Sequence, residues 1–357
     1  MHKFWRNGWQ RWWGLLLVIS LSLTACSGSD SDSPTSVAPT PTPTPTISND
    51  PGTVVVGIPI RSIGSLKLIG LPMLVGGGST ELLLDTGSAG VRVLSADAGN
   101  ATRTSTPSIV TFGDGTQFRG VLGNAVVTLG SLATEDAITV QLVDEVVCVD
   151  GTSNCSKEIF DGTGFFSGIV GTSLGNRTSN ASLFSPIAHL PTPFDSGYVI
   201  RTGGFGSGEG TMDLGLTDNN TAGFAVRSIP QVGIFPDGTP SYDDEALQVA
   251  HTISNTSIQN SLGNTIFDTG SSDIFLSPQA LGSAPFSTTF LPAGSSWRGV
   301  LDGGFVYEIQ VTTPITPGID RIFVDGTNDF QVLGMPLFFQ FDTFFDIDRG
   351  RIGFRAR

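Results

Sequence analysis

Charged side chains are scarce in this chain of 357 residues, at 14% of the total, and they are unevenly signed. Acidic residues number 32 against 18 basic ones, which gives a net charge of −14. A chain this acidic lacks a broad basic surface, so we expect neither a nucleic-acid partner nor an electrostatic hold on anionic lipid. Long segments with a 3.6-residue apolar period are missing as well, which argues against a helical fold.

The chain also has no apolar run long enough to cross a bilayer, and residues 1–26 are instead typical of an export signal. A basic front precedes an apolar core at Leu15–Ala25, which is shorter than the roughly 20 residues of a membrane span. The core ends in Leu-Thr-Ala-Cys, which resembles a bacterial lipobox with Cys26 as the lipidated residue. Ser27 resembles the outer-membrane sorting pattern of lipoproteins. The alternative is an ordinary signal peptide that contains a cysteine.

Residues 27–50 are rich in Pro, Thr and Ser, so they cannot form a core and are expected to be an extended tether. With Cys26 assigned to lipid, Cys148 and Cys155 remain, and an exported protein can keep them as a disulfide that closes a small loop. Neither His nor a further Cys lies nearby. We therefore expect no metal site, and the sequence indicates no cofactor.

Glycine (46 residues) and proline (21) are abundant, and with many Thr, Ser, Val and Phe residues they favour strands and turns. The composition predicts an all-β fold, and a proline-rich break near residue 190 divides it into lobes at 51–195 and 196–357. The predicted strands are 54–60, 65–69, 81–84, 91–94, 108–112, 125–129, 137–143, 198–201, 211–214, 224–227, 305–312, 330–333 and 351–354.

One phrase occurs twice in matching contexts. Asp-Thr-Gly-Ser stands at 85–88 and again at 268–271, each time after two apolar residues and shortly before an apolar stretch. Each copy predicts a buried strand that runs into a tight glycine turn and holds one carboxylate at a fixed point. If the two turns face each other, Asp85 and Asp268 form a carboxylate dyad. The alternative is two unrelated turn or N-cap aspartates.

A second phrase follows each copy, with Gly-Ile-Val-Gly at 168–171 and Gln-Val-Leu-Gly at 331–334. Two apolar residues and a glycine can thread beneath a turn, where a side chain at Gly171 or Gly334 would collide with it. The alternative for either copy alone is a buried strand that ends in glycine. As a pair, the phrases favour a structure in which each passes beneath its own Asp-Thr-Gly turn. They also predict that the chain contains two lobes of similar topology.

With both phrases in place, residues 52–357 resemble the pepsin-like aspartic peptidases, as a divergent bacterial member. Val-Thr-Phe-Gly-Asp-Gly-Thr at 110–116 is similar to the family's flap hairpin, which folds over bound substrate. The glycine-rich segment 198–216 resembles the family's crossing segment between lobes, and 344–354 resembles its closing hairpin. The resemblance implies an all-β, bilobal fold with the active-site cleft between two similar lobes.

The same resemblance implies roles for individual residues. Asp85 and Asp268 would hold the lytic water between them, because two carboxylates about 3 Å apart cannot both ionise and so share a proton. The threonines would bond across the lobes, the serines would donate to the outer carboxylate oxygens, and the glycines would permit close approach. The supporting residues are Thr86, Gly87, Ser88, Thr269, Gly270 and Ser271, and the flap residues expected at the substrate are Phe112, Gly113, Asp114 and Gly115.

Two positions depart from the family. The flap position usually filled by Tyr is Phe112, and the Trp that commonly partners that Tyr is replaced by Arg92. The flap can still close and bury substrate, but its hydrogen bonding must differ. Asp114 at the flap tip would either bond peptide backbone or serve only as a turn residue. The Pro-Thr tether stands where the family has a basic pro-segment, so we expect no zymogen control.

These residues predict a monomeric, lipid-anchored endopeptidase of the bacterial envelope that works below neutral pH. Its expected partners are extended peptides with bulky apolar residues beside the cut, and the membrane through Cys26. The alternative is a catalytically weak or inactive lipoprotein that binds peptides in the same cleft. A Gly-x-Ser-x-Gly match at 171–175, with His189 and His251 downstream, is also found in serine hydrolases. That motif requires a strand-turn-helix in an α/β sheet, which this sequence does not predict.

Overall fold

The computed structural model describes residues 46–47, 50–64, 66–149, 155–160, 164–175, 182–254, 256, 258, 261–277, 290–301, 304–324 and 330–357. The leader at 1–26, including Cys26, lies outside these residues. The same holds for the tether at 27–50 apart from Thr46, Ile47 and Asp50. The export signal, the lipidation and the extended tether therefore stay predictions from the sequence.

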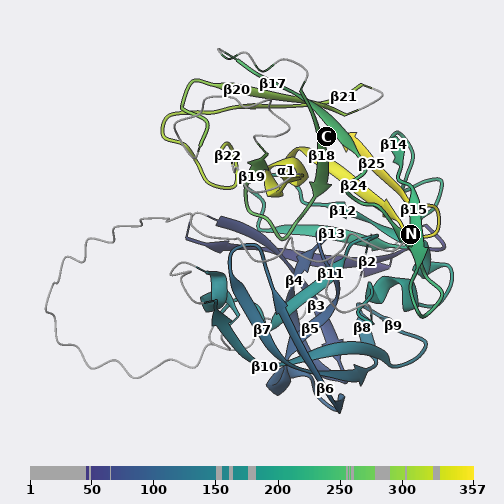
Figure 1. Cartoon of the computed structure of the whole chain (residues 1–357). Helices are drawn as coiled ribbons and strands as arrows, with labels where there is room; N and C mark the ends of the chain where they lie inside the picture. Colours follow the sequence, from purple (N-terminus) through teal and green to yellow (C-terminus); the bar gives the residue numbers. More distant parts are fainter. Residues whose placement is uncertain are drawn as a thin grey trace, which may run out of the picture.

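Strands dominate the described chain, and they fold into two lobes that are stacked in Figure 1, purple to teal below and green to yellow above. One 16-stranded sheet runs through both lobes, in the order β14-β25-β24-β12-β13-β2-β3-β4-β11-β5-β10-β7-β6 with β1, β8 and β9 at its side. Its strands are β1 (Thr46–Ile47), β2 (Val54–Ile63), β3 (Leu66–Val75), β4 (Gly78–Asp85), β5 (Ala89–Leu94), β6 (Thr102–Thr111), β7 (Thr116–Ala125), β8 (Val127–Leu129), β9 (Leu132–Ala133), β10 (Ile138–Cys148), β11 (Gly168–Thr172), β12 (Gly197–Arg201), β13 (Glu209–Leu214), β14 (Ala225–Ser228), β24 (Phe341–Asp346) and β25 (Arg351–Ala356).

A seven-stranded sheet and a separate two-stranded hairpin complete the second lobe. The larger sheet has the order β21-β20-β17-β18-β23-β19-β22, and the hairpin pairs β15 with β16. These strands are β15 (Gln231–Ile234), β16 (Pro240–Tyr242), β17 (Gln248–Ile253), β18 (Ser261–Phe267), β19 (Ile274–Leu276), β20 (Ser296–Leu301), β21 (Phe305–Gln310), β22 (Ile322–Val324) and β23 (Gln331–Leu333).

Helical segments are short and serve as connections. They are the 3₁₀ turns η1 (Ser95–Asp97), η2 (Ser156–Ile159), η3 (Pro186–His189) and η4 (Phe194–Ser196), and the α-helix α1 (Met335–Gln340). Over the described ranges, none of the helices combines the length and the apolar character that a bilayer crossing requires. The secondary structure is therefore the strand-and-turn content that the composition predicts.

The two Asp-Thr-Gly phrases lie in matching strand arrangements. In the first half, β11 runs parallel to β4 and antiparallel to β5, and β10 runs parallel to β5. In the second half, β23 runs parallel to β18 and antiparallel to β19, and β22 runs parallel to β19. This repetition confirms that one lobe plan occurs twice in the chain.

The apolar-apolar-glycine phrases thread beneath the turns, as predicted. A Cβ atom on Gly171, within β11, would lie 2.6 Å from the backbone of Ser88. In the second lobe, a Cβ atom on Gly334 would lie 2.3 Å from the backbone oxygen of Ser271. Both distances are shorter than real contacts of a Cβ atom. Each Asp-Thr-Gly turn can therefore pack on the segment beneath it only because that segment carries glycine at this position.

The lobes are joined through β12 and β13. β12 pairs with β24 of the closing hairpin, whereas β13 pairs with β2 near the start of the described chain. Tyr198 on β12 is fully buried, stacks on Phe345 and donates its hydroxyl to the Thr172 carbonyl at 3.0 Å. The segment that resembles an inter-lobe crossing therefore does connect the halves, and the predicted boundary at 195/196 falls inside η4, directly before it.

Apolar side chains form one large core and one smaller cluster. The smaller cluster, here called the flap-side cluster, consists of Leu68, Leu83, Phe118, Val143, Phe160, Phe166 and Ile169. Phe112, from the tip of the β6–β7 hairpin, packs against it. Phe118 makes edge-to-face contacts with Phe112 at 5.2 Å and with Phe160 at 5.1 Å between ring centroids. The hairpin tip is thus held to the first lobe by aromatic packing.

Candidate active site

Asp85 is the last residue of β4 and lies where the strand enters a tight turn. Its Oδ1 accepts the backbone N–H of Gly87 at 2.8 Å, and its Oδ2 accepts the hydroxyl of Ser88 at 2.6 Å. The residue is buried, with 7% of its surface exposed. Each carboxylate oxygen therefore has a donor from within the same turn, and the side chain is fixed in one orientation.

Asp268 follows β18 directly and repeats this arrangement in the second lobe. Its Oδ1 accepts the backbone N–H of Gly270 at 2.8 Å, and its Oδ2 accepts the hydroxyl of Ser271 at 2.7 Å. Its own N–H donates to the carbonyl of Leu333 at 3.0 Å, which ties the turn to β23. The two phrases therefore form the same local structure, one in each lobe.

Thr86 and Thr269 connect the two turns by four hydrogen bonds. The N–H of each threonine donates to the other's hydroxyl oxygen, at 3.2 Å from Thr86 and 3.0 Å from Thr269. Each hydroxyl donates in turn to a carbonyl of the opposite lobe, that of Phe267 or of Leu84, both at 2.7 Å. Both threonines are buried, so these bonds are shielded from competing water.

The cross-lobe bonds bring the two carboxyl groups into contact. The N–H of Gly87 bridges the two side chains, because it donates to Asp85 Oδ1 at 2.8 Å and also to Asp268 Oδ1 at 3.2 Å. A Cβ atom on Gly87 would lie 2.6 Å from Asp268 Cγ, and one on Gly270 would lie 2.9 Å from Asp85 Cγ. Glycine at these two positions is therefore what allows the carboxyl groups to approach each other.

The pKa of the Asp268 carboxyl group is raised above its ordinary value. Burial is the main cause, because a low-dielectric environment disfavours the charged form, and the neighbouring charge of Asp85 acts in the same direction. Hydrogen bonds from Ser271 and Gly270 oppose the shift without cancelling it. The pair consequently holds a proton at pH values where an isolated aspartate would be ionised.

The predicted flap is the hairpin of β6 and β7, with Phe112, Gly113, Asp114 and Gly115 at its tip. The tip is closed by hydrogen bonds from the N–H of Phe112 to the Thr116 carbonyl at 2.8 Å and from the N–H of Gly115 to the Phe112 carbonyl at 3.0 Å. Phe112 is the tip residue that packs inward, onto the flap-side cluster.

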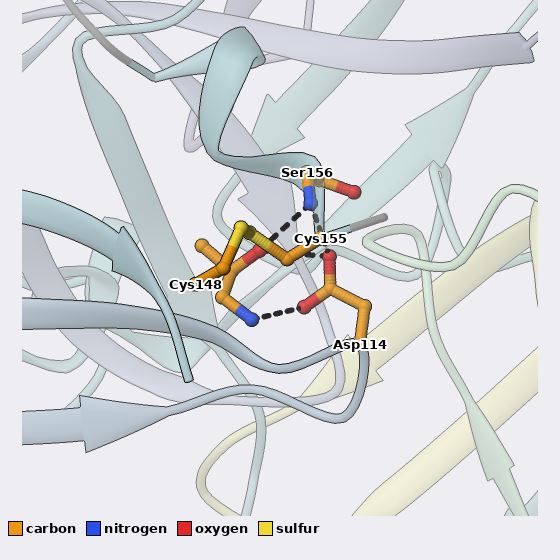
Figure 2. Close-up of a disulfide and its surroundings, with 5 residues drawn as sticks. Asp114, Cys148, Cys155 and Ser156 are labelled. Carbon is orange, nitrogen blue, oxygen red and sulfur yellow. Dashed lines mark hydrogen bonds between the residues drawn. A yellow bond between two sulfur atoms is a disulfide. The ribbon is translucent and has the colours of Figure 1, made fainter. Parts of the chain in front are cut away.

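Asp114 uses its carboxylate within the protein. Oδ1 accepts the N–H of Thr116 and Oδ2 accepts the Thr116 hydroxyl, both at 2.8 Å, and Oδ2 also accepts the N–H of Ser156 at 2.8 Å. Figure 2 shows Asp114 beside the disulfide between Cys148 and Cys155, with Ser156 directly after it. The predicted disulfide is therefore formed, and Ser156, directly after Cys155, anchors the flap tip through Asp114.

The serine-hydrolase alternative has no support in the geometry. The Ser173 hydroxyl donates to Asp244, and Nε2 of His189 lies 2.9 Å from a carboxylate oxygen of Asp237. His251 accepts a hydrogen bond from the indole N–H of Trp297 at 2.9 Å, and burial lowers the pKa of this histidine to about 3. Each of these polar groups thus has a structural partner. Across the described ranges, the structure also shows no cluster of three or more acidic, His or Cys side chains that could bind a metal ion.

Comparison with known proteins supports the fold. No family model matches the chain, and no curated protein matches it in sequence. Among solved structures, the crystal structure of an aspartic proteinase from Irpex lacteus is similar, with a TM-score of 0.55 and 18% sequence identity. The match covers 85% of this chain and 97% of that one. At this identity the likeness shows the fold alone, which is the all-β, bilobal, pepsin-like fold that the sequence predicts.

The anchoring of the flap tip gives a testable prediction. In Asp114→Ala, the amides of Thr116 and Ser156 lose their carboxylate acceptor, so we expect them to exchange with deuterium about five- to tenfold faster. This corresponds to a loss of roughly 1 kcal/mol of local hydrogen bonding. Asp136→Ala, at an exposed position away from the hairpin, is the control and should leave both amides unchanged. Unaltered exchange in Asp114→Ala would show that the carboxylate does not hold the tip.

Proposed function

We propose that the chain is an aspartic endopeptidase that hydrolyses peptide bonds with a water activated by Asp85 and Asp268. The proposal is carried by the contact between these two carboxyl groups, each presented by a matching turn of a different lobe. The raised pKa of Asp268 supports it, because the reaction requires one group to keep a proton while the other is ionised. The pepsin-like fold is consistent with this chemistry without establishing it.

The pair can supply both proton transfers of the reaction. Ionised Asp85 would take a proton from the attacking water while Asp268 gives its proton to the carbonyl oxygen, which yields a neutral tetrahedral diol. Asp85 would then protonate the amide nitrogen while Asp268 takes a proton from a diol hydroxyl, and the C–N bond breaks. The pair returns to its starting state with one proton, so no further reactant is needed.

The surroundings favour extended peptides with bulky apolar residues next to the cut. A peptide beside the β6–β7 hairpin could add strand-like backbone contacts. Phe112 at the hairpin tip is only partly buried, so its ring leaves aromatic surface there, backed by the buried flap-side cluster. Because both aspartates belong to one chain, the site needs no second copy, and we expect the protein to act as a monomer.

Replacing either aspartate tests the proposal directly. We expect Asp85→Asn and Asp268→Asn each to lower cleavage of a mixed peptide library by at least about 10²–10⁴-fold, because each removes one proton-transfer partner. Asp218→Asn, at an exposed turn, is the matched control and should cleave like the wild type. Products would be identified by mass spectrometry. Cleavage that persists in both dyad variants would refute the assignment.

The pH dependence has a definite sign. Because the pKa of Asp268 is raised in the folded protein, the proton it supplies is present at low pH and is lost as pH rises through that pKa. We therefore expect kcat/KM to be highest below neutral pH and to fall on the alkaline side. The same group stabilises the fold most at low pH and progressively less as pH rises. A rate profile without any fall on the alkaline side would contradict this assignment.

A non-catalytic peptide-binding role is the second candidate, and the flap provides the reason to consider it. Phe112 has no hydroxyl, and Arg92 stands where the pepsin-like family commonly has the Trp that partners the flap Tyr. The flap therefore makes different contacts here. Peptide binding by the folded wild type, without cleavage at any pH from 3 to 8, would favour this role over the peptidase.

We further propose that Cys26 carries lipid and that the tether holds the two lobes away from an outer membrane. The proposal is supported by the lipobox-like Leu-Thr-Ala-Cys and by the Pro-Thr-rich segment that follows. In a bacterial host, the wild type should be recovered in the membrane fraction and Cys26→Ser in the soluble fraction. Asp136→Asn, at an exposed position of the first lobe, is the control and should stay in the membrane fraction. Equal membrane recovery of Cys26→Ser would exclude lipidation at this residue.

A further inference from the structure

Arg92 is a fully buried cation that the mechanism above leaves without a role. It lies on β5 and has 0% of its surface exposed. Its Nη1 donates to the carbonyl of Gly90 at 3.3 Å, whereas Nε and Nη2 have no hydrogen-bond partner within the described part of the chain. Burying a guanidinium group is strongly unfavourable unless a counter-charge compensates it. The fold must therefore supply an anion close to this residue.

The register of three neighbouring strands identifies that anion. Gly171 on β11 pairs with Asp85 on one side and with Gly90 on the other, and two residues earlier Ile169 pairs with Arg92. Residues in register, and residues two apart on one strand, point to the same face of a sheet. Asp85 and Arg92 therefore lie on the same face of the sheet. The residues in register with Asp85 are Gly171 on β11 and Gly90 on β5, and neither has a side chain.

Other charged groups on the elements packed against β5 are engaged elsewhere or lie nearer the solvent. On the neighbouring β10, Asp144 pairs with Arg103 and Glu145 pairs with Arg119, all four at least two-fifths exposed. The charged side chains of η1, the flap tip and η2 are at least partly exposed, namely Asp97, Asp114, Lys157 and Glu158. Asp85 is the charge that acts on Arg92.

We propose that Arg92 is a positioning residue for the dyad: its positive charge holds Asp85 ionised, so that the single proton of the pair resides on Asp268. The inference rests on the proposed peptidase function, in which these are the two required states. Burial lowers the pKa of Arg92 to about 10, which leaves the side chain charged throughout the acidic and neutral range. The group of one cation, one carboxylate and one carboxylic acid is then electrically neutral.

The same side chain contacts the flap. The guanidinium carbon lies 5.8 Å from the ring centroid of Phe112, a distance at which a cation is attracted to an aromatic face. Phenylalanine needs no hydrogen-bond partner, so Phe112 can rest against the guanidinium where a hydroxyl-bearing ring would need an acceptor. Arg92 and Phe112 thus form a compatible pair, which links the charge of the dyad to the position of the hairpin tip.

The test compares the pH profiles of Arg92 variants. In Arg92→Met, which keeps a long side chain without the charge, the acid limb of the kcat/KM profile should move up by about one pH unit, because Asp85 loses its cation. Activity on the acid limb would fall about tenfold. Arg92→Lys retains the charge and should keep the wild-type acid limb, and Arg298→Met, on β20 of the second lobe, is the control. If folded Arg92→Met keeps the acid limb of the wild-type kcat/KM profile, the proposal is overturned.

A second measurement does not depend on catalysis or on one variant. With ¹³C-labelled aspartate, the titration midpoint of the Asp85 carboxyl should lie at higher pH in Arg92→Met, or in Arg92→Gln if the first variant does not fold. An unchanged midpoint would overturn the role of Arg92 even if the protein proved to be a binder. If the wild type cleaves no peptide but the midpoint still shifts in Arg92→Met, the peptidase is refuted and the electrostatic pairing of Arg92 with Asp85 stands.

Discussion

The exchange of hydrogen bonds between Thr86 and Thr269 is the constraint on which the rest of the site depends. The continuous sheet joins the lobes through β12 and β13, and the threonine bonds fix the two turns against each other. A shift of 1 Å is enough to break the hydrogen bond between two carboxyl groups. Because each threonine both donates to and accepts from the opposite lobe, the turns are fixed from both sides, and Asp85 and Asp268 are held in contact.

That enforced contact creates an electrostatic problem in an acidic protein, and the surroundings resolve it. Two carboxylates in contact cannot both be charged, so the pair retains a proton, which agrees with the raised pKa of Asp268. Arg92, also buried, offers the compensating positive charge. The flap tip is then fastened at two points, by Phe112 on the flap-side cluster and by Asp114 on Ser156 next to the disulfide. Arg92 and the two flap contacts therefore belong to the first lobe, whereas the protonated partner Asp268 comes from the second.

Much of this arrangement can be predicted from short segments of the sequence. The doubled phrases, with their apolar approaches and glycine threads, predicted the strands and turns around Asp85 and Asp268, because those features depend on residues close in the chain. The strand β7 (Thr116–Ala125) was not predicted. It carries polar side chains and glycines, and it is ordered by pairing with β6 and β10 rather than by its own propensity. Arg92 showed only as an unusual residue, since its burial depends on distant segments. The Ser156 contact of Asp114 is equally non-local.

The account stands on one shared proton between the two aspartates, and carboxyl-resolved titration measures it most directly. In protein labelled with ¹³C at aspartate, we predict that Asp268 keeps its proton well above the ordinary aspartate value of 3.8. In Asp85→Asn its titration should move back towards that value, because the neighbouring charge is gone. Two independent titrations near 3.8, unaffected by the substitution, would show that the carboxyl groups do not interact and would contradict the central claim.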